Sequence, residues 1–191
     1  MKHQLFLTAL LALFLSACQP TTEGETAQAQ TQAGTTTNEI AQRLDELGIE
    51  LPEASTPVAN YVNAVTAGNL VFLAGKGPKQ ADGTYITGKV GADLTEEEGY
   101  AAARLVAINQ LAALKAEIGN LDRVKRIVKV LGMVNCTPDY GNQPEVINGF
   151  SDLMVEIFGE KGKHARAAVG MGSLPRNIAV EIEMIVEIEP R

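Results

Sequence analysis

A chain of 191 residues with 46% hydrophobic and 20% charged residues has the composition of a single ordinary globular domain. Its formal net charge of −7 disfavours nucleic acid as a partner, because nucleic-acid binding needs lysine and arginine to neutralise phosphates. With two histidines and two cysteines in the whole chain, no spacing typical of a metal site occurs, and we expect neither a metal nor another cofactor.

The N-terminal residues have the pattern of an export signal. The apolar run over residues 5–15 matches the core of a signal peptide and is too short to span a bilayer as a helix. Leu15-Ser16-Ala17-Cys18 resembles the lipobox of bacterial lipoproteins, although an ordinary signal peptide with a chance cysteine is the alternative. We expect residues 1–17 to be a signal peptide and Cys18 to carry the lipid that holds the protein on a membrane.

The residue after Cys18 and the segment that follows it bear on location. Gln19 in place of Asp favours the outer membrane in lipoproteins of this kind, so we expect a lipid-anchored protein of the bacterial cell envelope that faces the periplasm. Residues 18–37 contain no large apolar side chain and are predicted to be a disordered tether. The folded domain is expected to span residues 38–191.

The first half of this domain shows local signals for helices and a hairpin. Helical spacing predicts a short helix over 38–47, and two β-rich runs at 61–65 and 70–74 predict a hairpin. Thr95 and Glu98 form a capping box that opens a long apolar helix, which Gly119 closes.

The second half continues the alternation of strands and helices. Residues 124–134 are expected to form a central strand, and a second helix begins after Asn142 and ends at Gly159. Two strands follow, and in the last one apolar residues alternate with glutamates. The sequence therefore predicts an α+β domain, a mixed sheet with two helices packed on one face and a polar opposite face.

The last two strands suggest a pair of charged residues. If these strands form a hairpin centred on the loop 171–176, Arg166 lies opposite Glu181 on the polar face. This pair is interpreted either as a surface ion pair or as part of a binding site, and a one-residue shift in register would separate the two residues.

Several segments resemble the RidA family of reactive-intermediate deaminases, also known as YjgF-type or L-PSP proteins. The resemblance is carried by Tyr61-Val62-Asn63-Ala64-Val65, by the stretch from Leu70 to Pro78, by Asn148, and by Ala165-Arg166 leading to Val180-Glu181-Ile182-Glu183. It implies a chorismate-mutase-like fold that assembles as a homotrimer with a pocket at each subunit interface. It also implies hydrolysis of small 2-imino or enamine acids to 2-oxo acids and ammonia.

The resemblance assigns roles to individual residues. Arg166 would bind the substrate carboxylate and Glu181 would place the attacking water, so these two are the candidate catalytic residues. Tyr61 of a neighbouring subunit, Asn148 and the backbone at Gly75 would complete the substrate-binding pocket. An arginine suits this role because its planar fork of donors matches a carboxylate and stays charged.

Other residues depart from the family pattern and keep alternatives open. Ala167 and Ala168 follow the arginine where well-studied members carry Ser and Cys, and Lys76 replaces a glutamine. A lipoprotein of the same fold that binds a small carboxylate without turnover is therefore the second hypothesis, and a ribonuclease is the third. Cys136 is interpreted as a buried, inert thiol and His164 as a satisfied or solvated residue.

Overall fold

The structure, a computed structural model, describes residues 38–57 and 59–190. The predicted signal peptide, the lipidated Cys18 and the predicted tether lie outside the described residues. The helices are α1 (Glu39–Glu46), α2 (Glu96–Ile118) and α3 (Gln143–Phe158), and the strands are β1 (Ala64–Ala67), β2 (Leu70–Lys76), β3 (Val124–Asn135), β4 (Ala165–Met171) and β5 (Val180–Ile188). No helix within 38–57 and 59–190 is long and apolar enough to cross a membrane.

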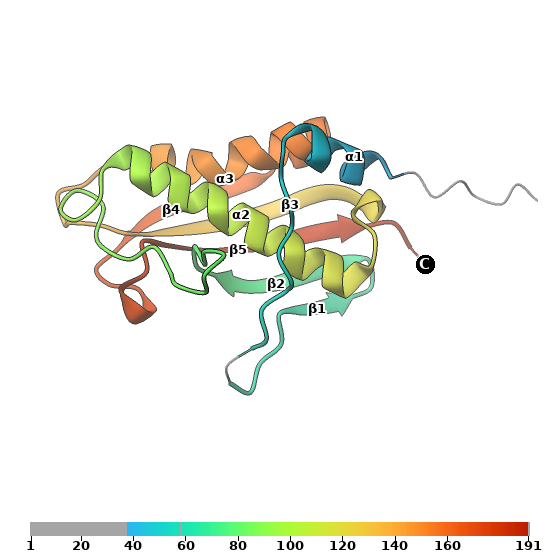
Figure 1. The fold of residues 1–191 in the computed structure, drawn as a ribbon, viewed down its shortest axis with the longest axis horizontal. Helices are drawn as coiled ribbons and strands as arrows, with labels where there is room; N and C mark the ends of the chain where they lie inside the picture. Colours follow the sequence, from blue (N-terminus) through green and yellow to red (C-terminus); the bar gives the residue numbers. More distant parts are fainter. Residues whose placement is uncertain (1–37, 58, 191) are drawn as a thin grey trace, which may run out of the picture. The chain divides into compact units, whose positions relative to one another are not determined.

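The five strands form one mixed sheet in the order β1-β2-β5-β3-β4. All neighbours are antiparallel except β3 and β4, which run parallel because the chain passes through α3 between them. Helices α2 and α3 cover one face, as Figure 1 shows. The predicted α+β architecture with two helices on one face is thus confirmed, with the short α1 added beside α3.

Local sequence signals set the ends of the long helices. The Thr95 side chain accepts a hydrogen bond from the Glu98 backbone, and the Glu98 carboxylate accepts one from the Thr95 backbone, so the predicted capping box is present. Gly119 ends α2 with φ of 83°, a value that glycine adopts without strain. Asn142 precedes α3 as predicted, but its side chain binds Glu96 and does not cap the helix.

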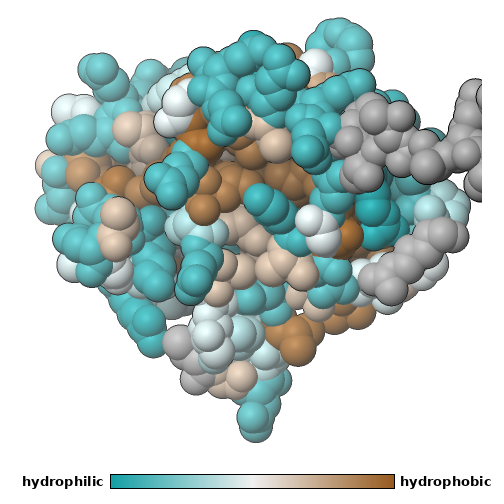
Figure 2. All heavy atoms as spheres, turned by 45° about the vertical axis from the view of Figure 1, so that its right-hand side comes forward, coloured by the Kyte–Doolittle hydropathy of each residue, from teal (hydrophilic) through white to brown (hydrophobic). Residues whose placement is uncertain are grey.

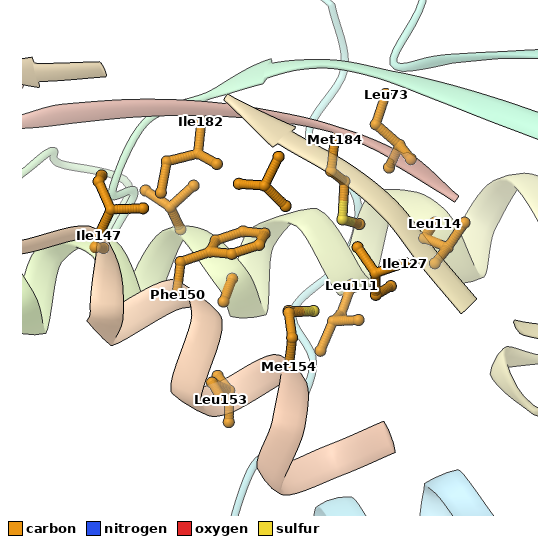
Figure 3. Packing of buried hydrophobic residues seen from close by; sticks show 14 of the residues in the cluster. Leu73, Leu111, Leu114, Ile127, Ile147, Phe150, Leu153, Met154, Ile182 and Met184 are labelled. Atoms are coloured by element: carbon orange, nitrogen blue, oxygen red, sulfur yellow. The ribbon is translucent and has the colours of Figure 1, made fainter. Parts of the chain in front are cut away.

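The core lies between the two helices and the covered face of the sheet. Phe150 and Met154 of α3 and Leu111 of α2 pack against Ile182 and Met184 of β5 (Figure 3), and all five are fully buried. The alternation predicted for β5 is confirmed, because its even-numbered residues from Val180 to Ile188 are buried. Cys136 is a buried free thiol, as predicted. Seen obliquely from the helix side, the surface shows a hydrophobic centre bordered by hydrophilic residues (Figure 2).

The predicted hairpin of the last two strands is wrong. β3 lies between β4 and β5, so Arg166 is paired with Val130, and Glu181 is paired with Met133. The reason is that a βαβ connection places β4 parallel to β3 at the sheet edge, a long-range arrangement that the short loop 171–176 conceals.

The face of the sheet away from the helices, called the open face here, is not uniformly polar. It carries the β5 glutamates as predicted, but the strand register also places Val65, Phe72 and Val169 on this face. These three side chains are 55%, 42% and 38% exposed, respectively. The open face is therefore a mixed apolar and acidic surface.

Candidate functional site

Arg166 lies on the edge strand β4 and is held by α3. Its Nη1 donates hydrogen bonds to Asn148 Oδ1 at 2.9 Å and to Ser151 Oγ at 3.0 Å. Asn148 and Ser151 are three residues apart and so lie on the same side of the helix. The structure therefore brings together two residues that the sequence analysis selected, Arg166 and Asn148, on the helix side of the sheet.

Ser151 and His164 extend this arrangement behind the arginine. The Ser151 hydroxyl lies 3.1 Å from His164 Nε2, and His164 Nδ1 lies 2.7 Å from the carbonyl oxygen of Gly162. Burial is the main cause that lowers the pKa of His164; the Gly162 hydrogen bond opposes it, and the Arg166 charge adds to the lowering. The predicted satisfied histidine is confirmed, but the sequence analysis did not connect it or Ser151 to Arg166.

The guanidinium of Arg166 forms no ion pair in the part of the chain that the structure describes. Among residues 38–57 and 59–190, no carboxylate lies within ion-pair distance of it. Its two bonding partners are neutral side chains, and the group is only half-buried. A fixed cation of this kind, oriented but not neutralised, can bind an external carboxylate.

Glu181 and Gly75 form a second arrangement on neighbouring strands. A Cβ atom added at Gly75 would lie 2.3 Å from Glu181 Oε1, so the carboxylate occupies the space that the glycine leaves. Burial raises the pKa of the half-buried Glu181, and the charge of Glu183 raises it further. A carboxylate with a raised pKa is suited to accept a proton from water.

Arg166 and Glu181 do not meet within one chain. Arg166 points to the helix side, where it contacts α3, whereas Glu181 alternates with the buried Val180 and Ile182 and lies on the open face. One strand separates their own strands, which places them about 10 Å apart across the sheet, with a further offset of about 10 Å along β3. The predicted position of Arg166 opposite Glu181 is therefore wrong for the single chain.

Among the described residues, the Tyr61 side chain forms no hydrogen bond with either arrangement. Its side chain is 49% exposed just before β1, at the opposite side of the sheet from β4. Lys76, next to Gly75, donates to Asn63 Oδ1, a contact that the sequence analysis did not predict. The three-residue spacing of Asn148 and Ser151 was the one local signal by which Ser151 could have been found.

Comparisons with known proteins identify relatives of this domain. The family model described as "YjgF/chorismate mutase-like, putative endoribonuclease" matches residues 41–188. Protein TCP17 of Trypanosoma cruzi is 45% identical over 150 residues, which are 78% of this chain and 94% of that protein. The 2-iminobutanoate/2-iminopropanoate deaminase of Dermatophagoides farinae is 30% identical over 142 residues, which are 74% of this chain and 95% of that protein.

A solved structure of a related protein has the same fold. The crystal structure of Atu1372, a protein of unknown function from Agrobacterium tumefaciens, is 45% identical and superposes with a TM-score of 0.73. The match covers 78% of this chain and 94% of that one. The matches therefore cover nearly the whole length of these relatives.

Proposed function

Because the chain belongs to the YjgF/chorismate mutase-like family, as its resemblance to reactive-intermediate deaminases predicted, we propose that it hydrolyses small 2-imino acids to 2-oxo acids and ammonia. A relative named as such a deaminase, matched over most of its length, supports this class of reaction. The observation that carries the proposal is the guanidinium of Arg166, which is oriented by Asn148 and Ser151 and lacks a carboxylate partner among the described residues.

Arg166 binds the substrate carboxylate in this proposal. Its Nη1 is already engaged by α3, and its Nη2 and Nε form no hydrogen bond among the described residues, so they are available to a ligand. Binding the carboxylate fixes the neighbouring imine carbon, and fixed geometry lowers the barrier for a reaction whose carbon is already electrophilic.

Glu181 activates water in this proposal. It removes a proton from a water molecule while the oxygen attacks the imine carbon, and the imine nitrogen takes up a proton. The tetrahedral intermediate then collapses to a carbonyl group and releases ammonia, so that one water is consumed for each imine. The raised pKa of Glu181 makes it a stronger base than an ordinary glutamate.

The two catalytic groups come from two copies of the chain in this proposal. Within one chain they lie on opposite faces of the sheet, too far apart to contact one small substrate. A homotrimer in which the β4 edge of one subunit approaches the open face of its neighbour would unite Arg166 with Glu181. The exposed Val65, Phe72 and Val169 supply apolar surface for such an interface, and the exposed Tyr61 would line the pocket from the neighbouring subunit.

A non-catalytic binding protein of the same fold is the second candidate. Ala167 and Ala168 contribute no polar side chain beside Arg166, which leaves carboxylate binding intact and removes groups that could assist turnover. RNA cleavage is not proposed, because the chain carries a net charge of −7 and Lys125 on β3 is already paired with Glu187.

The test is 2-oxo acid release from 2-iminopropanoate and 2-iminobutanoate generated in situ by an amino-acid oxidase. We expect the domain of residues 38–191 to accelerate release of the 2-oxo acid. Arg166→Ala should lower kcat/KM by about 30-fold or more, because loss of the arginine leaves the substrate carboxylate without its partner and weakens binding by about 2 kcal/mol or more. Arg126→Ala, at an exposed arginine of β3, is the matched control. No acceleration by an intact oligomer would instead support the binding protein.

The location at the cell envelope also stays a proposal. We propose that Cys18 is lipidated after removal of residues 1–17 and that residues 18–37 tether the domain to the periplasmic face of the outer membrane. In a bacterial host, the full chain should incorporate a palmitate analogue and fractionate with membranes. Cys18→Ala should abolish both, and membrane attachment that survives this substitution would contradict the proposal.

A further inference from the structure

A cavity of about 380 Å³ lies on the helix side of the sheet, away from Arg166 and Glu181. Its walls are α2, the segment 50–55 and the loop 76–85. Its size falls within the range of small-molecule sites in proteins. None of the residues assigned to the deaminase reaction lines this cavity, so the proposed reaction does not explain why the cavity exists.

The loop that forms one wall is built into the fold. Asn109 Nδ2 of α2 donates to the carbonyl oxygens of Gly77 and Lys79, at 3.3 Å and 3.1 Å, respectively. A Cβ at Gly77 would lie 2.9 Å from Ile178 and 3.3 Å from the Tyr85 ring, so the loop is packed closely at this point. The wall is therefore anchored on both α2 and the end of β2.

Two lysines form a cationic side of the cavity. Lys76 is half-buried and donates to Asn63, and Lys79 lies close enough for its charge to add to burial in lowering the pKa of Lys76. Neither lysine has a carboxylate within ion-pair distance among the described residues. Two adjacent cations that form no ion pair among the described residues favour a bound anionic group.

Two glutamates and an apolar floor complete the cavity. Glu50 and Glu53 line the same cavity as the lysines, and among the described residues neither forms an ion pair with them. Leu105 and Ile108 of α2 supply the floor. The cavity is thus lined by cationic, anionic and apolar side chains, a combination that suits a zwitterion with an apolar side chain.

We propose that this cavity binds a free α-amino acid with an aliphatic side chain. The carboxylate contacts Lys76 and Lys79, the ammonium group contacts Glu50 and Glu53, and the side chain lies on Leu105 and Ile108. The site is independent of the proposed deaminase site. Its nearest link to that site is Lys76, which directly follows Gly75, the residue packed against Glu181.

The test is calorimetric titration of the 38–191 domain with L-leucine, N-acetyl-L-leucine and L-leucinamide. We expect L-leucine to bind, and the two blocked compounds to bind at least about tenfold more weakly, because each lacks one of the two charges. Lys79→Met should weaken L-leucine binding by a similar factor, whereas Lys129→Met, at an exposed lysine of β3, should not.

Three outcomes would overturn the proposal. They are the absence of binding at millimolar L-leucine, equal affinity for all three compounds, and binding that is lost in Arg166→Ala. The last variant also separates the two proposals. It should abolish deaminase activity and leave L-leucine binding unchanged, so that either proposal can fail without the other.

Discussion

At the scale of single residues, the orientation of Arg166 depends on a chain of hydrogen bonds behind it. The Gly162 carbonyl can only accept, which assigns the proton on His164 to Nδ1 and leaves Nε2 as an acceptor. The Ser151 hydroxyl then donates to His164, and its oxygen accepts from Arg166. His164 acts as a positioning residue. The lowered pKa of His164 favours the neutral form that these hydrogen bonds require.

A substitution at Gly75 tests whether the position of the Glu181 carboxylate matters for activity. We predict that Gly75→Ala lowers kcat/KM on the order of 100-fold, because the new Cβ displaces the Glu181 carboxylate by more than an ångström. Thermal unfolding should change little, since a side-chain end and not backbone must move. Gly172→Ala, where nothing lies within 4 Å of the new Cβ, is the control. Unchanged kinetics in Gly75→Ala would argue against Glu181 as the base.

A substitution at Glu183 tests how the protonation state of Glu181 affects the reaction. Its negative charge disfavours a second negative charge on Glu181, so Glu183→Gln should lower the pKa of Glu181. The base must be ionised to act, and the acid limb of kcat/KM should therefore move to lower pH. The measurement is a pH–rate profile corrected for spontaneous imine hydrolysis. A shift to higher pH would contradict this assignment.

The candidate site residues could be selected from the sequence, but their arrangement could not. Arg166, Asn148, Gly75 and Glu181 were found by resemblance, and the structure pairs them as Arg166 with Asn148 and Gly75 with Glu181. The predicted contact between Arg166 and Glu181 failed because it assumed that strands adjacent in sequence are adjacent in the sheet. The relevant pairings join residues 36 positions apart in β3 and β4, and no local pattern specifies them.

At the scale of helices and strands, the elements with local signals were predicted well. The capping box at Thr95 and the glycine at 119 bound α2, and Gly159 bounds α3. The β1–β2 turn was also local, although it is tighter than predicted, since Ala67 and Leu70 are directly paired. Strand order is decided by which apolar faces pack together over the whole domain, and it lies beyond such local signals.

Gly149 determines how closely α2 and α3 approach each other. An added Cβ would lie 2.1 Å from the backbone oxygen of Tyr100 on α2, so Gly149→Ala must push the helices apart. We predict a loss of about 1–3 kcal/mol in the free energy of unfolding, despite the better helix propensity of alanine. Denaturant unfolding measures this, with Gly141→Ala at an open position just before α3 as the control. If both variants were equally stable, α2 and α3 would be packed less closely at Gly149 than the structure shows.

At the scale of the whole molecule, the proposal that one chain is not the functional unit rests on two features. The open face exposes large apolar side chains on β1, β2 and β4, at Val65, Phe72 and Val169. The two groups proposed for catalysis lie on opposite faces of the sheet. Both features are explained if a second copy covers the open face, and neither could be read from the sequence alone, because both depend on strand order.

Complementation between two inactive variants tests this shared site. Arg166→Ala and Glu181→Gln should each be inactive alone, but a trimer containing both variants has some interfaces at which an intact arginine meets an intact glutamate. With random assembly from equal amounts, about a quarter of the sites are intact, so co-expression should restore about a quarter of wild-type activity.

The control for complementation is the same two variants purified separately and mixed without exchange of subunits, which should stay inactive. Native mass spectrometry of differently tagged chains verifies that mixed oligomers have formed. Inactive mixed oligomers would mean that Arg166 and Glu181 act within one chain, which would require the sheet to deform by more than 10 Å, or that they do not act on the same substrate. Recovered activity would instead assign the two halves of the site to neighbouring subunits.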